Sequence, residues 1–266
     1  MASCARVTRY EDVRQALQSF QANGRRAHSS LYWLPDTLRE SAEAGRLTLC
    51  MGNTALLLLR DEGTHYACQL VADERFDWPL PPMEKPVVCE LVYTDRRPLP
   101  QALTHSLLAG GLSRLRTTLR FTCAPPFSCD MPPEVRPATA DDLPAVCALL
   151  QAYFDPRLDF IPQEAELCAA LATGALLVLP QGDKTTGFVY APVERNRGTL
   201  RHIAVAEGYR GRGLAKPLMR AALARFAACG AKSAELWSGA GNETAHHLYR
   251  AFGFAPDGRM ADEYTI

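Results

Sequence analysis

The pattern of apolar and polar residues divides the chain into alternating helical and extended segments. In the second half, apolar residues recur at helical spacing within 143–154, 162–173, 213–229 and 243–252, and the short apolar runs between these segments are typical of strands. From residue 134 onward the predicted order is strand, two helices, three strands, helix, strand, helix and a closing pair of strands. Hairpins combined with one crossover predict an α/β fold with a mixed, mostly antiparallel sheet flanked by helices.

The first half repeats this order less clearly. Helical patterns cover 11–20 and 36–45, and a third helix is expected from Pro98 to residue 118. Strands are expected at 46–52, 55–62, 65–73, 87–94 and 119–123. The shared order predicts an internal structural duplication, although the residue identities do not repeat.

A proline-rich segment separates the two halves. Five prolines lie between Pro125 and Pro137, and proline removes a backbone donor and disfavours helix in the residue before it. We therefore expect two domains, residues 1–130 and residues 131–266.

Composition narrows the class of protein. Apolar residues make up 47% and charged residues 22% of the 266 residues, which supports a buried core and argues against disorder. The 29 Lys and Arg residues balance the 29 Asp and Glu residues, so a dedicated nucleic-acid binder is not expected. Because there is no long apolar run and no hydrophobic signal core at the N-terminus, we expect a cytoplasmic protein with no membrane association.

Cysteine and histidine do not form a metal-binding pattern. The nine cysteines include no Cys-x-x-Cys pair, and most lie in apolar runs, as Cys50 does. Free buried thiols are therefore expected, with a Cys123–Cys129 disulfide as the alternative. His246 and His247 are neighbours on a predicted helix, where they point about 100° apart with no third ligand nearby. No metal is expected.

The stretch 208–216, Gly-Tyr-Arg-Gly-Arg-Gly-Leu-Ala-Lys, has the chemistry of an anion site. It joins a strand pattern to a helical one, and the first N–H groups of a helix lack intrahelical partners at the positive end of the helix dipole. Glycines at 211 and 213 expose backbone amides, and the arginines at 210 and 212 add positive charge.

Two common phosphate-binding loops do not fit this stretch. A P-loop requires lysine directly after the second glycine of its frame, where this chain has Leu214. A dinucleotide fingerprint requires a third small residue, where this chain has Lys216. A helix start with solvated arginines is the alternative to an anion site.

A longer pattern separates these readings. Arg210-x-x-Gly213-x-Ala215, preceded by the strand residues 203–205, resembles motif A of the GCN5-related N-acetyltransferase (GNAT) family. A second resemblance is to the family's N-x-x-A-x-x-L-Y-x-x-x-G-F pattern, carried by Asn242, Ala245, Leu248, Tyr249 and the sequence Phe-Gly-Phe at 252–254. The resemblance extends from residue 134 to residue 266.

The resemblance implies acetyl-CoA as co-substrate. In the family, the pyrophosphate lies on the glycine loop, and the pantetheine arm pairs with the preceding strand where two strands splay apart. Here the second splayed strand would be 233–238. Carried over by position, the pyrophosphate ligands are Arg210, Gly211, Arg212, Gly213, Leu214, Ala215 and Lys216. The expected pantetheine partners are Ile203, Ala204 and Val205, with Asn242 nearby.

The resemblance also places Tyr249 near the CoA sulfur, as a cofactor contact and as the acid for the departing thiolate. Its alternative role is an aromatic packing residue on an amphipathic helix. The base is less well defined. His202 has a suitable intrinsic pKa, and an imidazole packed in the core or against a helix is the equal alternative.

Two residues are expected to contact the acceptor, Arg201 and Thr199. Strand alternation predicts their side chains on one face and that of His202 on the other. An arginine here would repel a polyamine and suit an amine that also carries an anion, such as an amino acid. Further candidates for the acceptor pocket are Glu235, Trp237, Glu263 and Tyr264.

The first half lacks a glycine–arginine turn, and residues 94–102 are taken as its counterpart. It is expected to be a degenerate GNAT-like unit that binds no pyrophosphate and walls the acceptor pocket. An unrelated substrate or partner domain is the alternative.

The expected function is acetyl transfer from acetyl-CoA to a small-molecule primary amine, by direct attack in a ternary complex. The alternatives are a non-catalytic acyl-CoA sensor or scaffold and a protein acetyltransferase acting on a lysine or an N-terminus. The sequence leaves the oligomeric state open.

Overall fold

The computed structural model describes residues 3–22, 27–31, 33, 35–78, 80, 82–127 and 130–266. They form two compact units. The first unit combines Met1–Thr117 with Arg259–Ile266, and the second is Thr118–Gly258. The chain therefore leaves the first unit once and returns to it at its end.

This division differs from the expected boundary at residue 130, because two long strands each belong to both units. They are β7 (Ser113–Cys123) and β15 (Ala255–Thr265). In the second unit, the end of β7 pairs antiparallel with β14 (Ser233–Gly239). In the first unit, the end of β15 pairs antiparallel with β6 (Val87–Thr94). Each unit therefore contains one strand that begins in the other unit.

Two elements have bounds that differ from the prediction. The helix expected from Pro98 to residue 118 is α3 (Gln101–Ala109), and it ends at two glycines, the second of which, Gly111, has a φ of 92°. The residues that follow belong to β7. The closing pair of strands is the single strand β15, which contains Gly258 at a φ of 83°.

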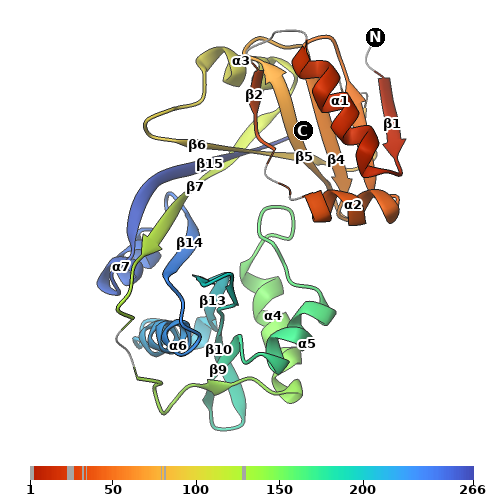
Figure 1. Ribbon diagram of the computed structural model, residues 1–266. Helices are drawn as coiled ribbons and strands as arrows, with labels where there is room; N and C mark the ends of the chain where they lie inside the picture. Colours follow the sequence, from red (N-terminus) through yellow and green to blue (C-terminus); the bar gives the residue numbers. More distant parts are fainter. Residues whose placement is uncertain are drawn as a thin grey trace. The chain divides into compact units, whose positions relative to one another are not determined.

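The first unit is a sheet with helices on both faces (Figure 1). Its strand order is β1-β3-β4-β5-β6-β15-β7, with β2 beside β5. Leu56 and Leu58 pack with α1 and α2, whereas Leu57 and Leu59 pack with α3, as the two-residue period of a strand requires. The remaining elements are β1 (Ser3–Val7), α1 (Tyr10–Ala22), β2 (Ala27–Ser29), α2 (Pro35–Glu43), β3 (Leu47–Met51), β4 (Ala55–Asp61) and β5 (Tyr66–Asp73).

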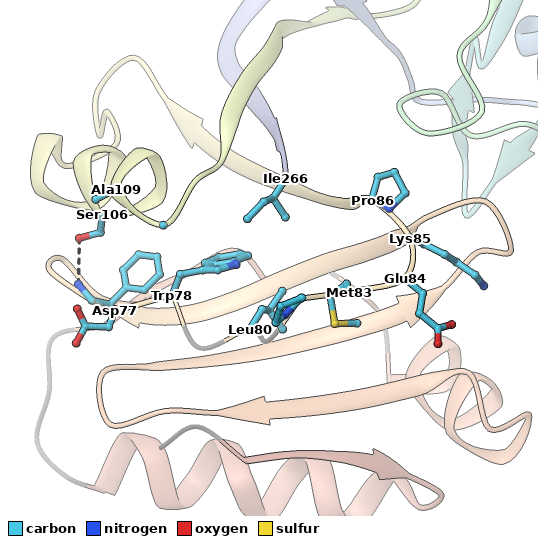
Figure 2. Close-up of a pocket in the computed structure, with 13 residues that line it drawn as sticks. Asp77, Trp78, Leu80, Met83, Glu84, Lys85, Pro86, Ser106, Ala109 and Ile266 are labelled. Atoms are coloured by element: carbon cyan, nitrogen blue, oxygen red, sulfur yellow. Dashed lines mark hydrogen bonds between the residues drawn. The ribbon is translucent and has the colours of Figure 1, made fainter.

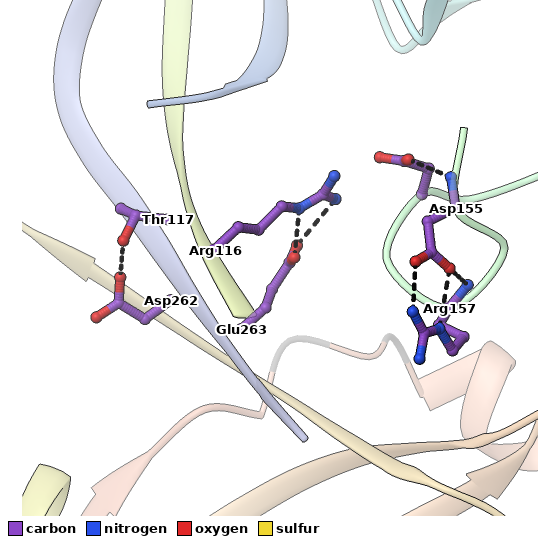
Figure 3. A network of polar contacts seen from close by, with 7 residues as sticks. Arg116, Thr117, Asp155, Arg157, Asp262 and Glu263 are labelled. Atoms are coloured by element: carbon purple, nitrogen blue, oxygen red, sulfur yellow. Dashed lines mark hydrogen bonds and ion pairs between the residues drawn. The ribbon is translucent and has the colours of Figure 1, made fainter. Parts of the chain in front are cut away.

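Polar side chains link β7 to β15 within the first unit. Figure 3 shows Arg116 donating to Glu263 and Thr117 donating to Asp262. Both carboxylates are buried, and Tyr264 lies in the core of this unit. Glu263 and Tyr264 were two candidates for the acceptor pocket. In the structure, Glu263 links β15 to β7 and Tyr264 packs in the core of the first unit.

The second unit contains a four-stranded sheet of order β13-β10-β9-β8, together with the strands β7, β14, β12 and β11. Alternate residues of the four-stranded sheet pack on opposite helices: Val178 and Phe188 with α4 and α5, Leu177 and Val189 with α6 (Figure 1). The elements are β8 (Arg136–Pro137), α4 (Leu143–Tyr153), α5 (Glu164–Ala172), β9 (Leu176–Gln181), β10 (Lys184–Tyr190), β11 (Val193–Glu194), β12 (Arg197–Thr199), β13 (His202–Val205), α6 (Ala215–Ala228) and α7 (Glu243–Ala251), with 3-10 turns at Ala140–Asp142 and Glu207–Tyr209.

The strand expected over residues 199–206 is divided between these two groups of strands. β12 pairs parallel with β14, and β13 then pairs antiparallel with β10. The N–H of Leu200 still donates to the carbonyl of Glu235, whereas the N–H of Arg201 donates to the carbonyl of Tyr190. The change of partner occurs between residues 200 and 201, and the predicted splayed pair of strands is confirmed.

The first unit contains the corresponding parallel pair, β5 and β6. Between the parallel strands the second unit has α6, whereas the described residues of 74–86 in the first unit form no helix. α3 follows β6 as α7 follows β14. In each unit, the equivalent segment is the one that joins the two parallel strands. The counterpart of the glycine–arginine turn is therefore within 74–86, and not at 94–102 as expected from the next helix along the chain.

A cavity of 830 Å³ lies beside this segment in the first unit (Figure 2). Its apolar walls include Phe76, Trp78, Leu80, Met83 and Ile266. Among the described lining residues, the one cation is Lys85, whose Nζ lies 2.7 Å from a carboxylate oxygen of Asp61. The described walls of this cavity hold no cluster of positive charge, and the expectation that this half binds no pyrophosphate stays a prediction.

The expectation that the cysteines are free is wrong for one pair. Cys4 of β1 and Cys50 of β3 are directly opposite each other, with Cα atoms 4.0 Å apart, and form a disulfide. The sequence pattern does not reveal β1 as a strand, so this register was not visible. Cys168 and Cys229 are free but exposed. Cys129 lies outside the described residues, so the Cys123–Cys129 alternative stays a prediction.

No helix in the described part of the chain is both long and apolar enough to cross a membrane.

The position of β7, which belongs to both units, leads to a prediction about fragments of the chain. Residues 118–258 are expected to be the more stable form of the second unit, and residues 131–266 to lack cooperative unfolding, because the latter fragment removes β7 from beside β14. The removed strand includes Phe121, which is fully buried, and loss of such a side chain alone costs about 3–5 kcal/mol. Thermal unfolding followed by circular dichroism compares the two fragments. Equal, cooperative melting of both would contradict this division of the chain.

The disulfide is expected to stabilise the first unit. It closes a loop with a sequence separation of 46 residues, and the lower chain entropy of the cross-linked unfolded state corresponds to about 2–4 kcal/mol of stability. Replacing Cys4 by Ser should lower the free energy of unfolding by this amount in the absence of reductant, and should have no effect in its presence. Denaturant unfolding of both proteins measures the difference. Alkylation of Cys4 and Cys50 in the unreduced, unfolded protein would show that the bond does not form.

Candidate functional site

The open edge of β13 is the first part of the site. β13 ends the four-stranded sheet, and no strand among the described residues pairs with its second side. The N–H of Ala206 donates to the carbonyl of Thr186, and alternation along the ladder turns Ala204 toward β10 in the same way. Ile203 and Val205 therefore direct their backbone groups away from β10. An extended chain can add to this side as a further strand.

The glycine–arginine loop follows directly after β13. Gly211 and Gly213 each have a φ of 76°, a left-handed conformation in which a side chain would be strained. A Cβ atom at either glycine would meet no atom within 4 Å, so space is open beside the backbone. These glycines are required by the turn, and they leave the amides at the start of α6 accessible to an anion.

Both arginines of the loop are held by contacts within it. Nε of Arg210 donates to the carbonyl of Val205 at 2.9 Å, and Nη2 of Arg212 donates to the carbonyl of Gly208 at 3.0 Å. The guanidinium of Arg212 also lies 5.3 Å from the centre of the Tyr209 ring. Because each guanidinium has five N–H donors, one such bond leaves donors for an anion. The loop thus holds two positive charges beside the exposed amides.

The last residues of the predicted pyrophosphate site differ in exposure. Leu214 and Ala215 are partly buried against the core of the second unit, which anchors the start of α6. Lys216 is exposed in the first turn of that helix. The structure therefore brings residues 210–216 together as one surface, with an anchored side and a charged side.

Tyr249 is buried in α7, with 6% of its surface exposed. Its ring packs against Phe121 at a centroid distance of 5.9 Å. Burial raises the pKa of its hydroxyl to about 12, against the opposite effect of the Ser238 side chain, which it contacts. Tyr249 therefore packs in the core, as expected for an aromatic packing residue. Its hydroxyl also stays protonated at neutral pH, which the proposed role as an acid requires.

Asn242 has a local structural role. It is the N-cap of α7, and its Oδ1 accepts a hydrogen bond from the N–H of Ala245 at 3.2 Å. The cap accounts for the asparagine of the motif, because its side chain reaches the amide three positions later. The cap fixes where α7 begins and so where Tyr249 lies.

His202 is buried between aromatic rings. Its ring makes an edge contact with Phe154 at 4.7 Å and is stacked on Tyr190 at 6.4 Å, and 4% of the residue is exposed. The ring donates to the backbone carbonyl of Phe160, while Nδ1 has no partner among the described residues. Burial lowers the pKa of His202 to about 4. This placement favours the packed imidazole over the catalytic base.

Arg201 is accompanied by carboxylates. Its guanidinium lies 3.7 Å from Glu166 and 3.9 Å from Glu194, and it is 5.1 Å from the centre of the Phe160 ring. Glu166 also accepts a hydrogen bond from Tyr190 at 2.9 Å. Because two negative charges outnumber the one positive charge, the basis for expecting an acceptor with its own anion is weakened.

Thr199 is separated from Arg201 by the change of sheet. It is opposite Glu235 in the parallel pair of β12 and β14, whereas Arg201 is already bonded to β10. Simple alternation therefore does not relate these two side chains. Glu235 itself lies 3.4 Å from Arg120 and 3.5 Å from Arg197, and Trp237 is 39% exposed.

The adjacent histidines of α7 point in different directions. His246 is buried with its ring 4.9 Å from that of Phe121, whereas His247 is exposed. Within the described ranges, no group of three metal-ligating side chains occurs.

Sequence reasoning did not identify Tyr153, Ser238, Glu166 or Glu194, which contact the predicted site residues. Tyr153 contacts Arg210, and the two glutamates contact Arg201. These contacts join segments distant in the chain, so no local spacing signals them. Only the aromatic pair at 153–154, at the end of an apolar helix pattern, was visible beforehand.

His202 gives a pH prediction. Its folded pKa of about 4 lies below the unfolded value of about 6.5, so the unfolded state binds the proton more readily between these values. The contribution of the buried, neutral His202 to the free energy of unfolding is fully present above pH 6.5. It falls by roughly 3 kcal/mol as the pH decreases to 4. The difference in free energy of unfolding between wild type and His202→Gln should therefore shrink over this range. A difference that stays constant from pH 7 to pH 4 would show that His202 is not buried in its neutral form.

Comparisons with known proteins agree with this geometry. The sequence model of the Acetyltransferase (GNAT) family matches residues 143–254. No curated protein matches the chain. A GCN5-related N-acetyltransferase from Sphaerobacter thermophilus has a similar structure, with a TM-score of 0.61 and 16% identity over 98% of this chain and 95% of that one.

Two further solved structures have the same extent. A GNAT-family acetyltransferase from Colwellia psychrerythraea has a TM-score of 0.57 at 12% identity, over 98% of this chain and 99% of that one. A tandem GNAT protein from the clavulanic acid biosynthesis pathway has a TM-score of 0.56 at 12% identity, over 100% and 98%. At these identities the structures show the fold alone. Residues 143–254 match the Acetyltransferase (GNAT) family model, and the chain as a whole has the fold of GNAT structures.

Proposed function

We propose that this protein is an N-acetyltransferase that transfers an acetyl group from acetyl-CoA to a primary amine in a ternary complex. One observation carries the proposal: the open edge of β13 leads directly into a loop with two left-handed glycines and two arginines at the start of α6. An extended arm ending in a pyrophosphate is the kind of ligand that suits an open strand edge followed by an anion site.

In this proposal the cofactor is held in two places. The backbone groups of Ile203 and Val205 pair with the amides of the pantetheine arm, and Ala204 keeps the strand bonded to β10. Residues 210–216 hold the pyrophosphate through backbone amides and the charges of Arg210, Arg212 and Lys216. Asn242 supports the site by fixing the start of α7.

The proposed chemistry is direct attack of the amine nitrogen on the thioester carbonyl. A C–N bond forms, the C–S bond breaks, and the CoA thiolate takes a proton from Tyr249. The attacking nitrogen loses one proton to solvent, and Tyr249 takes a proton back from solvent, so the step balances. A hydroxyl whose pKa is raised to about 12 is protonated at neutral pH and can donate to a thiolate. The outward N–H groups of β13 are proposed as the backbone donors for the developing oxyanion.

His202 is not proposed as the base. With a pKa of about 4 and a ring enclosed by Phe154 and Tyr190, it is a weak base away from solvent. We propose instead that it packs β13 against the end of α4. The acceptor is proposed to be a small amine that contacts the Arg201 region. Thr199 contacts it only if the acceptor extends toward β12.

The cellular location stays a prediction. Use of acetyl-CoA favours the cytoplasm, whereas the Cys4–Cys50 disulfide is of a kind that is rare in reducing compartments.

Tyr249→Phe tests the proposed acid. The variant should lose on the order of 10²-fold in kcat, because the thiolate then leaves without a proton donor, while its Kd for CoA stays within about twofold of wild type. Release of free thiol from acetyl-CoA, measured with a panel of amino acids, polyamines, aminoglycosides and lysine peptides, gives both the activity and the acceptor class.

Three outcomes separate the alternatives. Full activity of Tyr249→Phe would remove the acid role. Tight CoA binding by wild type with no turnover across the panel would favour an acyl-CoA sensor, and turnover of peptides alone would favour a protein acetyltransferase. Failure of wild type to bind CoA would refute the proposed function as a whole.

A further inference from the structure

Two consecutive aromatic residues at the end of α4 contact both ends of β13. Phe154 packs its ring against His202, the first residue of the strand, at 4.7 Å. Tyr153 contacts the chain just beyond the last residue of the strand, at Glu207 and Arg210. The end of α4 therefore contacts the segments on either side of the open strand edge.

Tyr153 makes two different contacts with the loop. Its hydroxyl accepts a hydrogen bond from the N–H of Glu207 at 2.7 Å, at the start of the 3-10 turn. The face of its ring lies under the guanidinium of Arg210, with the central carbon 4.0 Å from the ring centre. A cation at this distance from an aromatic face is attracted by the ring quadrupole.

Arg210 is consequently held on two sides. Its Nε donates to the carbonyl of Val205, and its planar group lies on the ring of Tyr153. A free arginine side chain has about 2 kcal/mol of rotamer entropy, part of which is lost whenever it is fixed on a ligand. A guanidinium that is already fixed loses less on binding, so its contact with an anion is stronger.

We propose that Tyr153 is a positioning residue for the cofactor pyrophosphate, acting through Arg210 and the 207–209 turn. The inference rests on the proposed function, since it assigns a role within the acetyl-CoA site. Tyr153 does not contact the reacting atoms in this proposal. It holds the charge and the backbone of the loop in the conformation that receives the pyrophosphate.

Two substitutions separate the contacts. Tyr153→Phe keeps the ring beneath Arg210 and removes the hydroxyl, so the Kd for CoA should rise about 2–10-fold. Tyr153→Leu removes both contacts, and the Kd should rise roughly 10–50-fold. Calorimetry with CoA measures both. The KM for acetyl-CoA should rise in parallel, while kcat stays within about threefold, because the reacting groups are untouched.

Tyr93→Phe is the matched control. It also removes one tyrosine hydroxyl that is bonded within the protein, in this case to Asp262 at 3.2 Å in the first unit. Its Kd for CoA should be unchanged. Thermal unfolding of all variants shows whether a weaker Kd merely follows a loss of stability. A loss of stability would lower kcat as well, and the Kd of Tyr153→Phe would not lie between those of wild type and Tyr153→Leu.

A second measurement needs no ligand. Trypsin cleaves after arginine in mobile loops, so cleavage after Arg210 should be about tenfold faster in Tyr153→Leu than in wild type. Equal Kd values for wild type and Tyr153→Leu would overturn the inference while leaving the proposed function in place. If wild type itself does not bind CoA, it is the proposed function that fails, and faster cleavage in Tyr153→Leu would still show that Tyr153 fixes the loop.

Discussion

The change of partner strand between Leu200 and Arg201 is the constraint on which the second unit depends. Up to Leu200 the backbone is bonded to β14, and from Arg201 onward it is bonded to β10. A strand with full partners on both sides has no free backbone groups, so this separation is what leaves one side of β13 open. The loop and α6 follow from the end of the same strand. The residues around the change of partner therefore fix the position of both the open edge and the glycine–arginine loop.

Aromatic side chains maintain that separation. His202 is enclosed by Phe154 and Tyr190 on one face of β13, and Arg210 is held on Tyr153 beyond its end. These contacts use α4, which lies on the opposite side of the four-stranded sheet from α6 (Figure 1). Helices on both faces are thus needed to present a single strand edge. Among the described strands, β7 is the antiparallel partner of β14.

Sequence patterns identified the elements best where periodicity was strong and local. The helices α4, α5, α6 and α7 and the glycine–arginine loop were predicted from local patterns, because helical spacing and glycine turns are properties of a short segment. The split strand pair was predicted only through the resemblance to the GNAT family. Predictions that required pairing were less successful. The helix expected to reach residue 118 gave way to β7, and the closing hairpin to the single strand β15, since a strand's length is set by the partners it meets.

The sequence by itself thus determined the residues of the glycine–arginine loop, the α/β order and the match of residues 143–254 to the GNAT family model. Only the tertiary structure decided which charges are balanced and which groups are buried. Arg201 meets Glu166 and Glu194 across the fold, His202 loses its solvent, and Cys4 meets Cys50 across two strands. The physical reason is that charge pairing and desolvation depend on neighbours in space, which spacing along the chain does not encode.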